Sequence, residues 1–214
     1  MKYFIKIFKE SIIVVILSSI FGLISGTLLS SNKEILYTIP ILLLILPALN
    51  SLIGDILAGI ILSIFILPFD SFLALILMIP ALLSLRGNLS GPFIARTSRD
   101  LIIGDFTKRS WIENVFATFI LAIITAIFIG IFSIILNSII FDLKVLPTVH
   151  FILIPIVSII LTLSISIPCS TGLNYLVFKK GLNPNNVVNP VMTAIDDFFT
   201  VFCFFLTLIM LGVS

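Results

Sequence analysis

Long apolar runs, separated by short polar breaks, dominate the pattern along the chain. They fall near residues 12–30, 35–67, 71–105 (continuously apolar only as far as 86), 113–141, 147–178 and 186–212. A helix needs about 20 apolar residues to cross the hydrocarbon of a bilayer, and backbone groups in lipid must pair within helices or closed barrels. Because the runs lack strict alternation and are far longer than barrel strands, they predict transmembrane helices.

The predicted fold class is therefore all-α integral membrane: a polytopic helical bundle of about six apolar segments in a single transmembrane domain, 1–214. Composition agrees, with 60% hydrophobic and only 10% charged residues, because soluble domains carry about 25% charged residues. The run at 12–30 is longer than a signal-peptide core, so we expect a retained helix. No linker divides the chain, and no soluble regulatory domain is expected. The predicted location is the cell membrane, multi-pass.

The charged residues give information about orientation. The net charge is only +2, and the basic residues sit in short clusters between apolar runs, which argues against nucleic-acid binding. The clusters predict that one side of the membrane is rich in lysine and arginine. Lys33 and Lys144 fall on the other side. A single crossing by 35–67 would conflict with this rule, so the number of crossings in 35–86 and the side of the N-terminus stay open. The predicted basic side holds Lys2, Lys6, Lys9, Arg86, Arg96, Arg99, Lys108, Arg109, Lys179 and Lys180.

A weak internal repeat relates residues 47–56 to residues 80–89. Both begin with Pro-Ala-Leu and carry Ser-Leu and Gly in register. Duplicated elements with interrupted helices are common in transporters and often lie at the binding site. Chance similarity between leucine-rich segments is the alternative.

Asp196 and Asp197 are the most informative residues, because they lie near the middle of the last apolar segment. A charged side chain at the centre of the membrane costs roughly 2.5–3.5 kcal/mol on insertion scales. None of the last three apolar segments contains a Lys or Arg that could compensate for them. The pattern therefore predicts a metal cation as their partner. The alternative is a protonated pair that is hydrogen-bonded between helices.

Helical geometry extends the acidic pair into a polar stripe. At about 100° per residue, seven polar residues of this segment fall within one arc of about 120°. Mg²⁺ prefers oxygen ligands and keeps several waters, and the stripe supplies carboxylates, hydroxyls and an amide. One His and two separated Cys make Zn²⁺ or Cu⁺ sites improbable. The stripe consists of Asn189, Thr193, Asp196, Asp197, Thr200, Cys203 and Thr207.

Two stretches together resemble the membrane domain of the MgtE-type magnesium transporters and their eukaryotic solute-carrier relatives. Residues 80–88, followed by Ala95-Arg96-Thr97-Ser98, are similar to that family's Pro-Ala-Leu…Gly-Asn…Ser-Arg-x-Ser element. Residues 189–197 resemble its final helix, in which an acidic residue follows a proline as Asp197 follows Pro190.

The resemblance implies a five-helix core with an extra N-terminal element, and a homodimer whose pore lies between subunits, so that Asp197 would meet its symmetry mate. It implies Mg²⁺ as the transported ion, with no bound cofactor. The family's helix usually has a small residue at the position of Asp196, so the local charge would be doubled here. The expected metal ligands are Asp197, Asp196 and Thr193, and the expected pore-lining residues are Asn189, Thr200, Asn88 and Gly87.

The predicted function is a divalent-cation channel or transporter, and not an enzyme. The partners expected are divalent cations, the lipid bilayer and a second copy of the chain. An intramembrane aspartyl protease is a competing reading because Gly54-Asp55 and Gly104-Asp105 occur beside Pro-Ala-Leu elements. However, Leu52 and Ile102 stand where such enzymes need a glycine. A non-transporting scaffold would leave the acid pair unexplained. The choice between Mg²⁺ and Mn²⁺ or Co²⁺, the coupling and the direction stay open.

Overall fold

The computed structural model describes residues 78–141 and 146–213, together with positions 52, 55–56, 58–60, 62–63 and 75. The predicted segment at 12–30, most of 35–67, most of the 47–56 repeat and the extra N-terminal element lie outside the described residues. The side of the N-terminus and the number of crossings before residue 78 lie outside them too.

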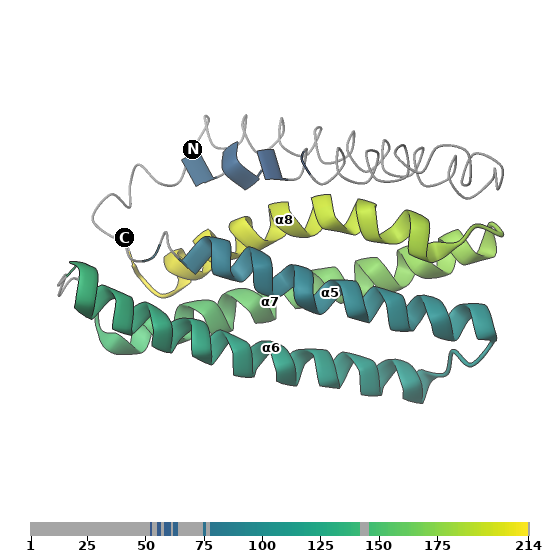
Figure 1. Ribbon diagram of the computed structural model, residues 1–214, viewed down its shortest axis with the longest axis horizontal. Helices are drawn as coiled ribbons and strands as arrows, with labels where there is room; N and C mark the ends of the chain where they lie inside the picture. Colours follow the sequence, from purple (N-terminus) through teal and green to yellow (C-terminus); the bar gives the residue numbers. More distant parts are fainter. Residues whose placement is uncertain are drawn as a thin grey trace.

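Four long helices run along one common axis in the described region (Figure 1). They are α5 (Met78–Ile103), α6 (Lys108–Leu136), α7 (Thr148–Lys179) and α8 (Pro184–Met210), and α6 continues into a π-helical turn, η2 (Asn137–Phe141). The residues described contain no strand. The helices α6, α7 and α8 are long and apolar enough to cross a membrane. The prediction of an all-α, multi-pass membrane protein is confirmed.

The last three predicted segments agree with α6, α7 and α8 to within a few residues. The polar stretch from Arg86 to Glu113 is different, because α5 continues through it as far as Ile103 with Pro92 inside the helix. The continuously apolar run stops at 86, although the helix does not. One face of this polar stretch is apolar and buried, including Leu89, Phe93 and Leu101, so tertiary packing stabilises the helix where average hydropathy does not.

Local sequence signals set the ends of the helices. Gly104 follows α5 with a φ of +83°, a conformation that suits a residue without a Cβ. Thr107 caps α6 by accepting a hydrogen bond from the Ser110 amide. Asn183 caps α8 by accepting one from the Asn185 amide at 3.1 Å, and Pro184 occupies the first turn, where its missing N–H is not needed.

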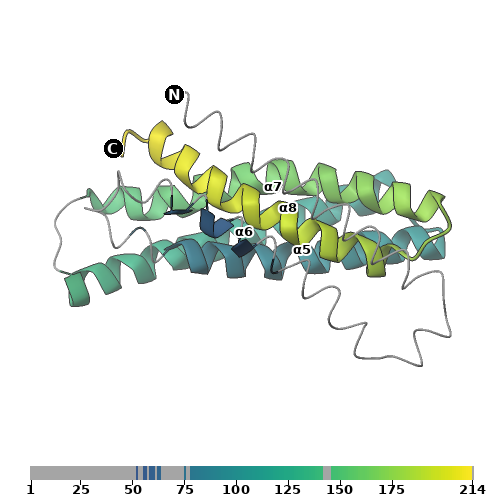
Figure 2. The same ribbon diagram turned by 90° about the horizontal axis from the view of Figure 1, so that it is seen from above.

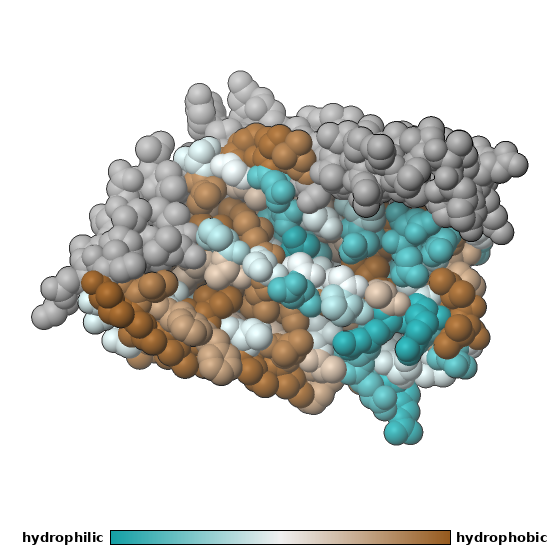
Figure 3. Space-filling view, viewed as in Figure 1, coloured by the Kyte–Doolittle hydropathy of each residue, from teal (hydrophilic) through white to brown (hydrophobic). Residues whose placement is uncertain are grey.

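The helices differ in how deeply they are buried. Only 22% of the most apolar stretch of α6 is buried, whereas the figure is 67% for α8, which crosses the bundle obliquely (Figure 2). Phe116, Phe128 and Phe132 project outward from α6, and apolar residues cover this part of the surface in Figure 3. The helix α6 therefore faces lipid, whereas α8 is the most deeply buried of the three membrane-spanning helices and packs against α5 and α7.

Candidate cation-binding site

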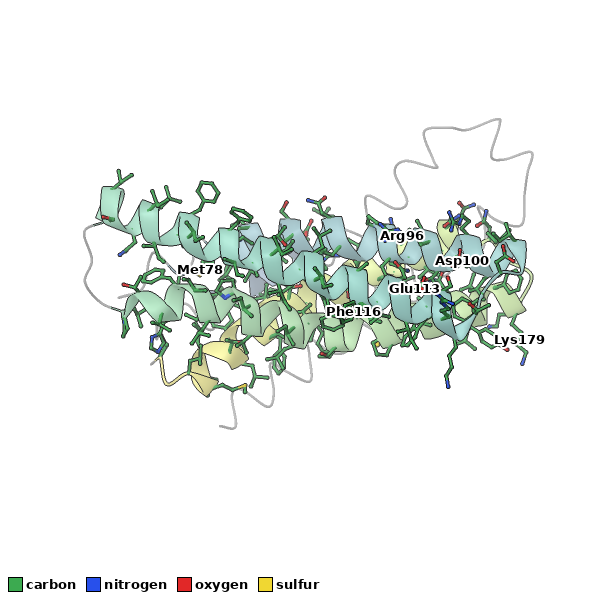
Figure 4. All side chains as sticks on the ribbon, turned by 90° about the horizontal axis from the view of Figure 1, so that it is seen from below. Met78, Arg96, Asp100, Glu113, Phe116 and Lys179 are labelled. Atoms are coloured by element: carbon green, nitrogen blue, oxygen red, sulfur yellow. The ribbon has the colours of Figure 1, made fainter. Side chains whose placement is uncertain are left out.

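Most charged side chains of the described helices gather at one end of the bundle. Figure 4 shows Arg96, Asp100, Glu113 and Lys179 near this end, with Met78 toward the other. The ion pair between Arg109 and Glu113 at 2.9 Å is largely exposed, so it contributes little to stability. Among the described residues this clustering agrees with the predicted basic side, with the exception of one residue; Lys2, Lys6 and Lys9 lie outside the described residues.

The exception is Arg86, which lies inside the bundle. The prediction that Arg86 belongs to the basic side of the membrane is wrong. Arg86 is only 5% exposed, and its position near the start of α5 places it away from the charged end. The side chain points toward α8, whose N-terminal half packs antiparallel to α5.

The guanidinium of Arg86 contacts both members of the acidic pair. One terminal nitrogen donates a hydrogen bond to Oδ1 of Asp197. The other lies 3.6 Å from Oδ2 of Asp196. Asp196 is 0% exposed and Asp197 is 2% exposed. The sequence predicted a metal cation as the partner of this pair, with a protonated pair as the alternative, and neither included Arg86. The compensating charge in the structure comes from a helix outside the last three segments.

Hydroxyl groups and a third carboxylate complete the surroundings of the pair. Ser90 on α5 and Ser166 on α7 lie beside the carboxylate of Asp196. Asp55, one of the few described residues before position 75, lies beside Asp197. Neither oxygen of Asp196, nor Oδ2 of Asp197, has a well-formed hydrogen bond among the described residues. The group therefore holds more acceptors than the guanidinium satisfies.

The residues predicted for the stripe divide into two groups. The structure brings Thr200, Cys203 and Thr207 into the same buried interior as the acidic pair. Asn189 is exposed and Thr193 is partly exposed. Val191 and Phe198 are also buried, so the buried side of α8 extends beyond its polar arc. The partly exposed side of its middle turns carries Ile195, Phe199 and Phe202.

The two residues predicted on α5 also lie apart from the acidic pair. Gly87 and Asn88 are exposed on the outer face of α5. Asn88 lines a cavity of about 130 Å³ between α5 and α6, together with Arg96 and Thr118. Gly87 and Asn88 therefore do not share the interior space that Asp196, Asp197 and Thr200 occupy in one protomer.

Sequence reasoning missed Arg86 as a site residue, and it missed a row of polar residues on α7. The row has a sequence signal, namely a polar residue at every fourth position within an otherwise apolar segment. At about 100° per residue each step of four advances by about 40°, so the five members span an arc of about 160° on one half of the helix. The row consists of Ser158, Thr162, Ser166, Ser170 and Asn174, and every member is at most 2% exposed.

Within the described part of the chain, no three His, Cys, Asp or Glu side chains are grouped so that they could hold a metal ion. The site offers two buried carboxylates, the nearby carboxylate of Asp55, several hydroxyls and one guanidinium. Such a set suits a cation that retains part of its water shell.

Comparison with known proteins gives one match. Residues 79–207 match MgtE, a family of divalent cation transporters and not of enzymes. No curated protein and no solved structure matches the chain. The matched region begins in α5 and ends in α8, so it contains Arg86, the acidic pair and the whole row on α7. Because the match covers more than half of the 214 residues, this chain belongs to the MgtE family of divalent cation transporters.

Proposed function

We propose that this chain carries Mg²⁺ across the membrane through a site built on Asp196 and Asp197. One observation carries the proposal: two carboxylates are buried against a single guanidinium. With both buried carboxylates ionised, the pair and Arg86 together keep one net negative charge, and the carboxylate of Asp55 lies beside them. Such a charge attracts a cation strongly because little water is present to screen it.

The hydroxyls near the pair are suited to coordinate a hard cation. The hydroxyl of Thr200 donates its proton to the backbone oxygen of Asp196 at 2.7 Å, and that of Thr193 donates to the oxygen of Asn189 at 2.9 Å. Each oxygen then turns lone pairs away from its own helix, and oxygen lone pairs are the ligands that Mg²⁺ prefers. We assign the carboxylates of Asp196 and Asp197 as the main ligands, with Thr193 and Thr200 in support.

Arg86 acts in this proposal as a tethered cation that occupies the site in the absence of Mg²⁺. An incoming ion must displace the guanidinium from at least one carboxylate. Because the guanidinium and the divalent ion compete for the same oxygens, the arrangement with Arg86 bound to both carboxylates is the closed state. Opening exchanges one buried cation for another, so the acidic pair is never left without a counter-ion.

The outer face of α5 supports the homodimer that the resemblance implies. Small or polar residues follow one another along this face, and small residues allow close packing of helices in membranes. Gly87 and Asn88 would line the approach to the site there, together with Asn189 on α8. For Asp197 to meet its symmetry mate, its side chain would have to leave Arg86. The face is formed by Ser84, Gly87, Asn88, Gly91 and Ala95.

The proposal is tested by Mg²⁺ uptake into proteoliposomes that contain a fluorescent Mg²⁺ indicator. We expect the wild-type chain to carry Mg²⁺ and Asp197→Asn or Asp196→Asn to reduce the initial rate by about tenfold or more, since each removes a ligand charge. Asp105→Asn is the matched control, because Asp105 is exposed in the turn between α5 and α6. Unchanged uptake in both test variants would exclude the acidic pair as the ion site.

A further inference from the structure

A third carboxylate lies beside the acidic pair and comes from outside the region that matches the family. Asp55 is next to Asp197, and it precedes the matched residues 79–207. The described positions between 52 and 63 are helical. Asp55 is exposed, whereas Asp196 and Asp197 are buried. The three carboxylates therefore lead from the surface of the protomer to its interior.

Packing against α8 holds Asp55 in this place. Ala58 is buried in the same apolar cluster as Phe198 and Val201 of α8, and Leu62 packs against that cluster as well. Positions 55, 58 and 62 are three and four residues apart, so their side chains are neighbours on one helix face. The face that carries Asp55 is therefore the face that contacts α8.

The depth of Asp55 indicates that its exposed side does not face lipid. Asp197 is the middle residue of α8 (Pro184–Met210), so Asp55, which lies beside it, is near the middle of the membrane. A carboxylate in lipid at this depth is costly, and ionisable residues there almost always face the bundle interior or a water-filled space. The exposed side of Asp55 therefore meets water or a polar surface. Such a position agrees with an ion path between subunits, which the family resemblance implies.

The charges and oxygens of this group match one divalent cation. Three ionised carboxylates and the guanidinium of Arg86 carry a net charge of −2, which a single divalent ion balances. Independently, neither oxygen of Asp196, nor Oδ2 of Asp197, has a hydrogen-bond partner among the described residues, although roughly 90% or more of buried polar groups have one. The three carboxylates do not form a group that could hold a bare metal ion. Because Mg²⁺ keeps several of its waters, carboxylates at this spacing suit a hydrated ion.

We infer that Asp55 is the carboxylate that first receives the cation: it holds the hydrated ion at the protomer surface, next to Asp197. The identity of the ion rests on the proposed function, whereas the exposure of Asp55 at the middle of the membrane does not. An ion held there repels the guanidinium of Arg86, because like charges interact strongly where little water screens them. The ion at Asp55 thus weakens the contact between Arg86 and Asp197 before it takes the place of the guanidinium.

The first test is the Mg²⁺ dependence of the initial uptake rate in proteoliposomes. We expect Asp55→Asn to raise the Mg²⁺ concentration at half-maximal rate by about tenfold and to leave the maximal rate nearly unchanged, since it removes binding of the ion before the transport step. Asp55→Glu keeps the charge and is expected to restore most of the affinity. A merely structural role would lower the maximal rate and would not be rescued by glutamate.

Asp105→Asn is the matched control, because it removes the same charge from the exposed turn between α5 and α6. An unchanged half-maximal concentration for Asp55→Asn, in a chain whose uptake Asp197→Asn reduces, would overturn the inference and leave the proposed function intact. A wild-type chain that carries no Mg²⁺ would refute the proposed function instead, and the second test then decides on Asp55.

The second test does not depend on transport. Asp55→Cys is combined with Cys169→Ala and Cys203→Ser, which replace the two native cysteines, and is treated with a small, positively charged methanethiosulfonate reagent. We expect it to react at least about tenfold faster than Ile124→Cys, because only a hydrated thiol ionises to the reactive thiolate. Ile124 is the matched control, since it is exposed near the middle of the lipid-facing helix α6.

Millimolar Mg²⁺ is expected to slow the reaction of Asp55→Cys, because the ion and the reagent compete for the same negative charge. Reaction no faster than that of Ile124→Cys would overturn the inference, whatever the uptake assay shows. Fast reaction that Mg²⁺ leaves unchanged would also overturn it, since the surface would then be hydrated but would hold no ion.

Discussion

At the scale of single residues, Arg86 has the largest effect on the charge at the acidic pair. An isolated pair of carboxylates in the interior would need protons or a metal ion to compensate for its charge, whereas the ionised pair bonded to Arg86 keeps one negative charge. A buried ion pair is seldom a source of net stability compared with apolar residues of the same size. The presence of Arg86 is therefore better explained by function than by folding.

This role predicts the behaviour of Arg86→Met. We expect the variant to lose about 3–5 kcal/mol of stability, because two carboxylates remain buried without their partner. Millimolar Mg²⁺ is expected to raise its thermal unfolding midpoint more than that of the wild type, since the ion can occupy the vacated position. The measurement is thermal unfolding in detergent with and without Mg²⁺.

Two further variants check the origin of this loss. The triple change Arg86→Met, Asp196→Asn, Asp197→Asn removes all three charges and is expected to recover most of the lost stability. Arg99→Met is the control, because the Arg99 side chain is 69% exposed and surface changes usually stay within about 0.5 kcal/mol. Equal midpoints for Arg86→Met and Arg99→Met would show that the contact of Arg86 with the acidic pair does not stabilise the protein.

At the scale of helices, the contact between α6 and α7 depends on a missing side chain. A Cβ at Gly130 would lie 2.8 Å from the backbone oxygen of Phe151 and 2.9 Å from the Cα of Ile152. These neighbours are backbone atoms and cannot rotate away. Gly130 thus lets α6 pack directly on α7, and this contact keeps the lipid-facing helix attached to the buried ones.

We expect Gly130→Ala to destabilise the protein by about 1–3 kcal/mol through overpacking at this contact. Gly172→Ala on α7 is the matched control, since its Cβ would meet nothing within 4 Å, and alanine favours a helix over glycine by roughly 0.5–1 kcal/mol. When thermal unfolding is measured in detergent, we expect a lowered midpoint for Gly130→Ala and not for Gly172→Ala. A midpoint for Gly130→Ala that equals or exceeds the wild-type value would mean that α6 and α7 can move apart at this contact with no loss of stability.

At the scale of the whole molecule, the basic residues of the described region are concentrated at one end of the bundle. Arg96, Lys108 and Arg109 lie there with Lys179 and Lys180, all of them exposed. Lysine- and arginine-rich ends of membrane helices face the cytoplasm. The start of α7 and the end of α8 would then face the outside.

This orientation is checked with a membrane-impermeant maleimide on intact cells, in a background in which the two native cysteines are replaced through Cys169→Ala and Cys203→Ser. We expect Thr148→Cys, at the exposed start of α7, to be labelled from outside. Lys180→Cys, which follows the other end of the same helix, should be labelled only after the cells are permeabilised. The opposite pattern would invert the topology and contradict the charge argument.

Much of the fold was predictable because its determinants are local. The lengths of α6, α7 and α8 follow from apolar runs that a bilayer selects, and the start of α8 follows from Asn183 and Pro184. The family resemblance was confirmed over residues 79–207. The course of α5 beyond Arg86 was harder to predict, because its helical state depends on burial against three partners and is not visible in its own hydropathy.

The sequence by itself determined that this is a helical membrane protein. It also determined that the last helix carries an acidic pair whose burial in the membrane costs free energy. Each conclusion follows from the composition of continuous segments. Only the tertiary structure decided which charge compensates for that pair, because Arg86 lies 111 residues before Asp197 along the chain. It also decided that the polar rows of α7 and α8 share one interior. Contacts between helices depend on how the segments pack, and no single segment carries that information.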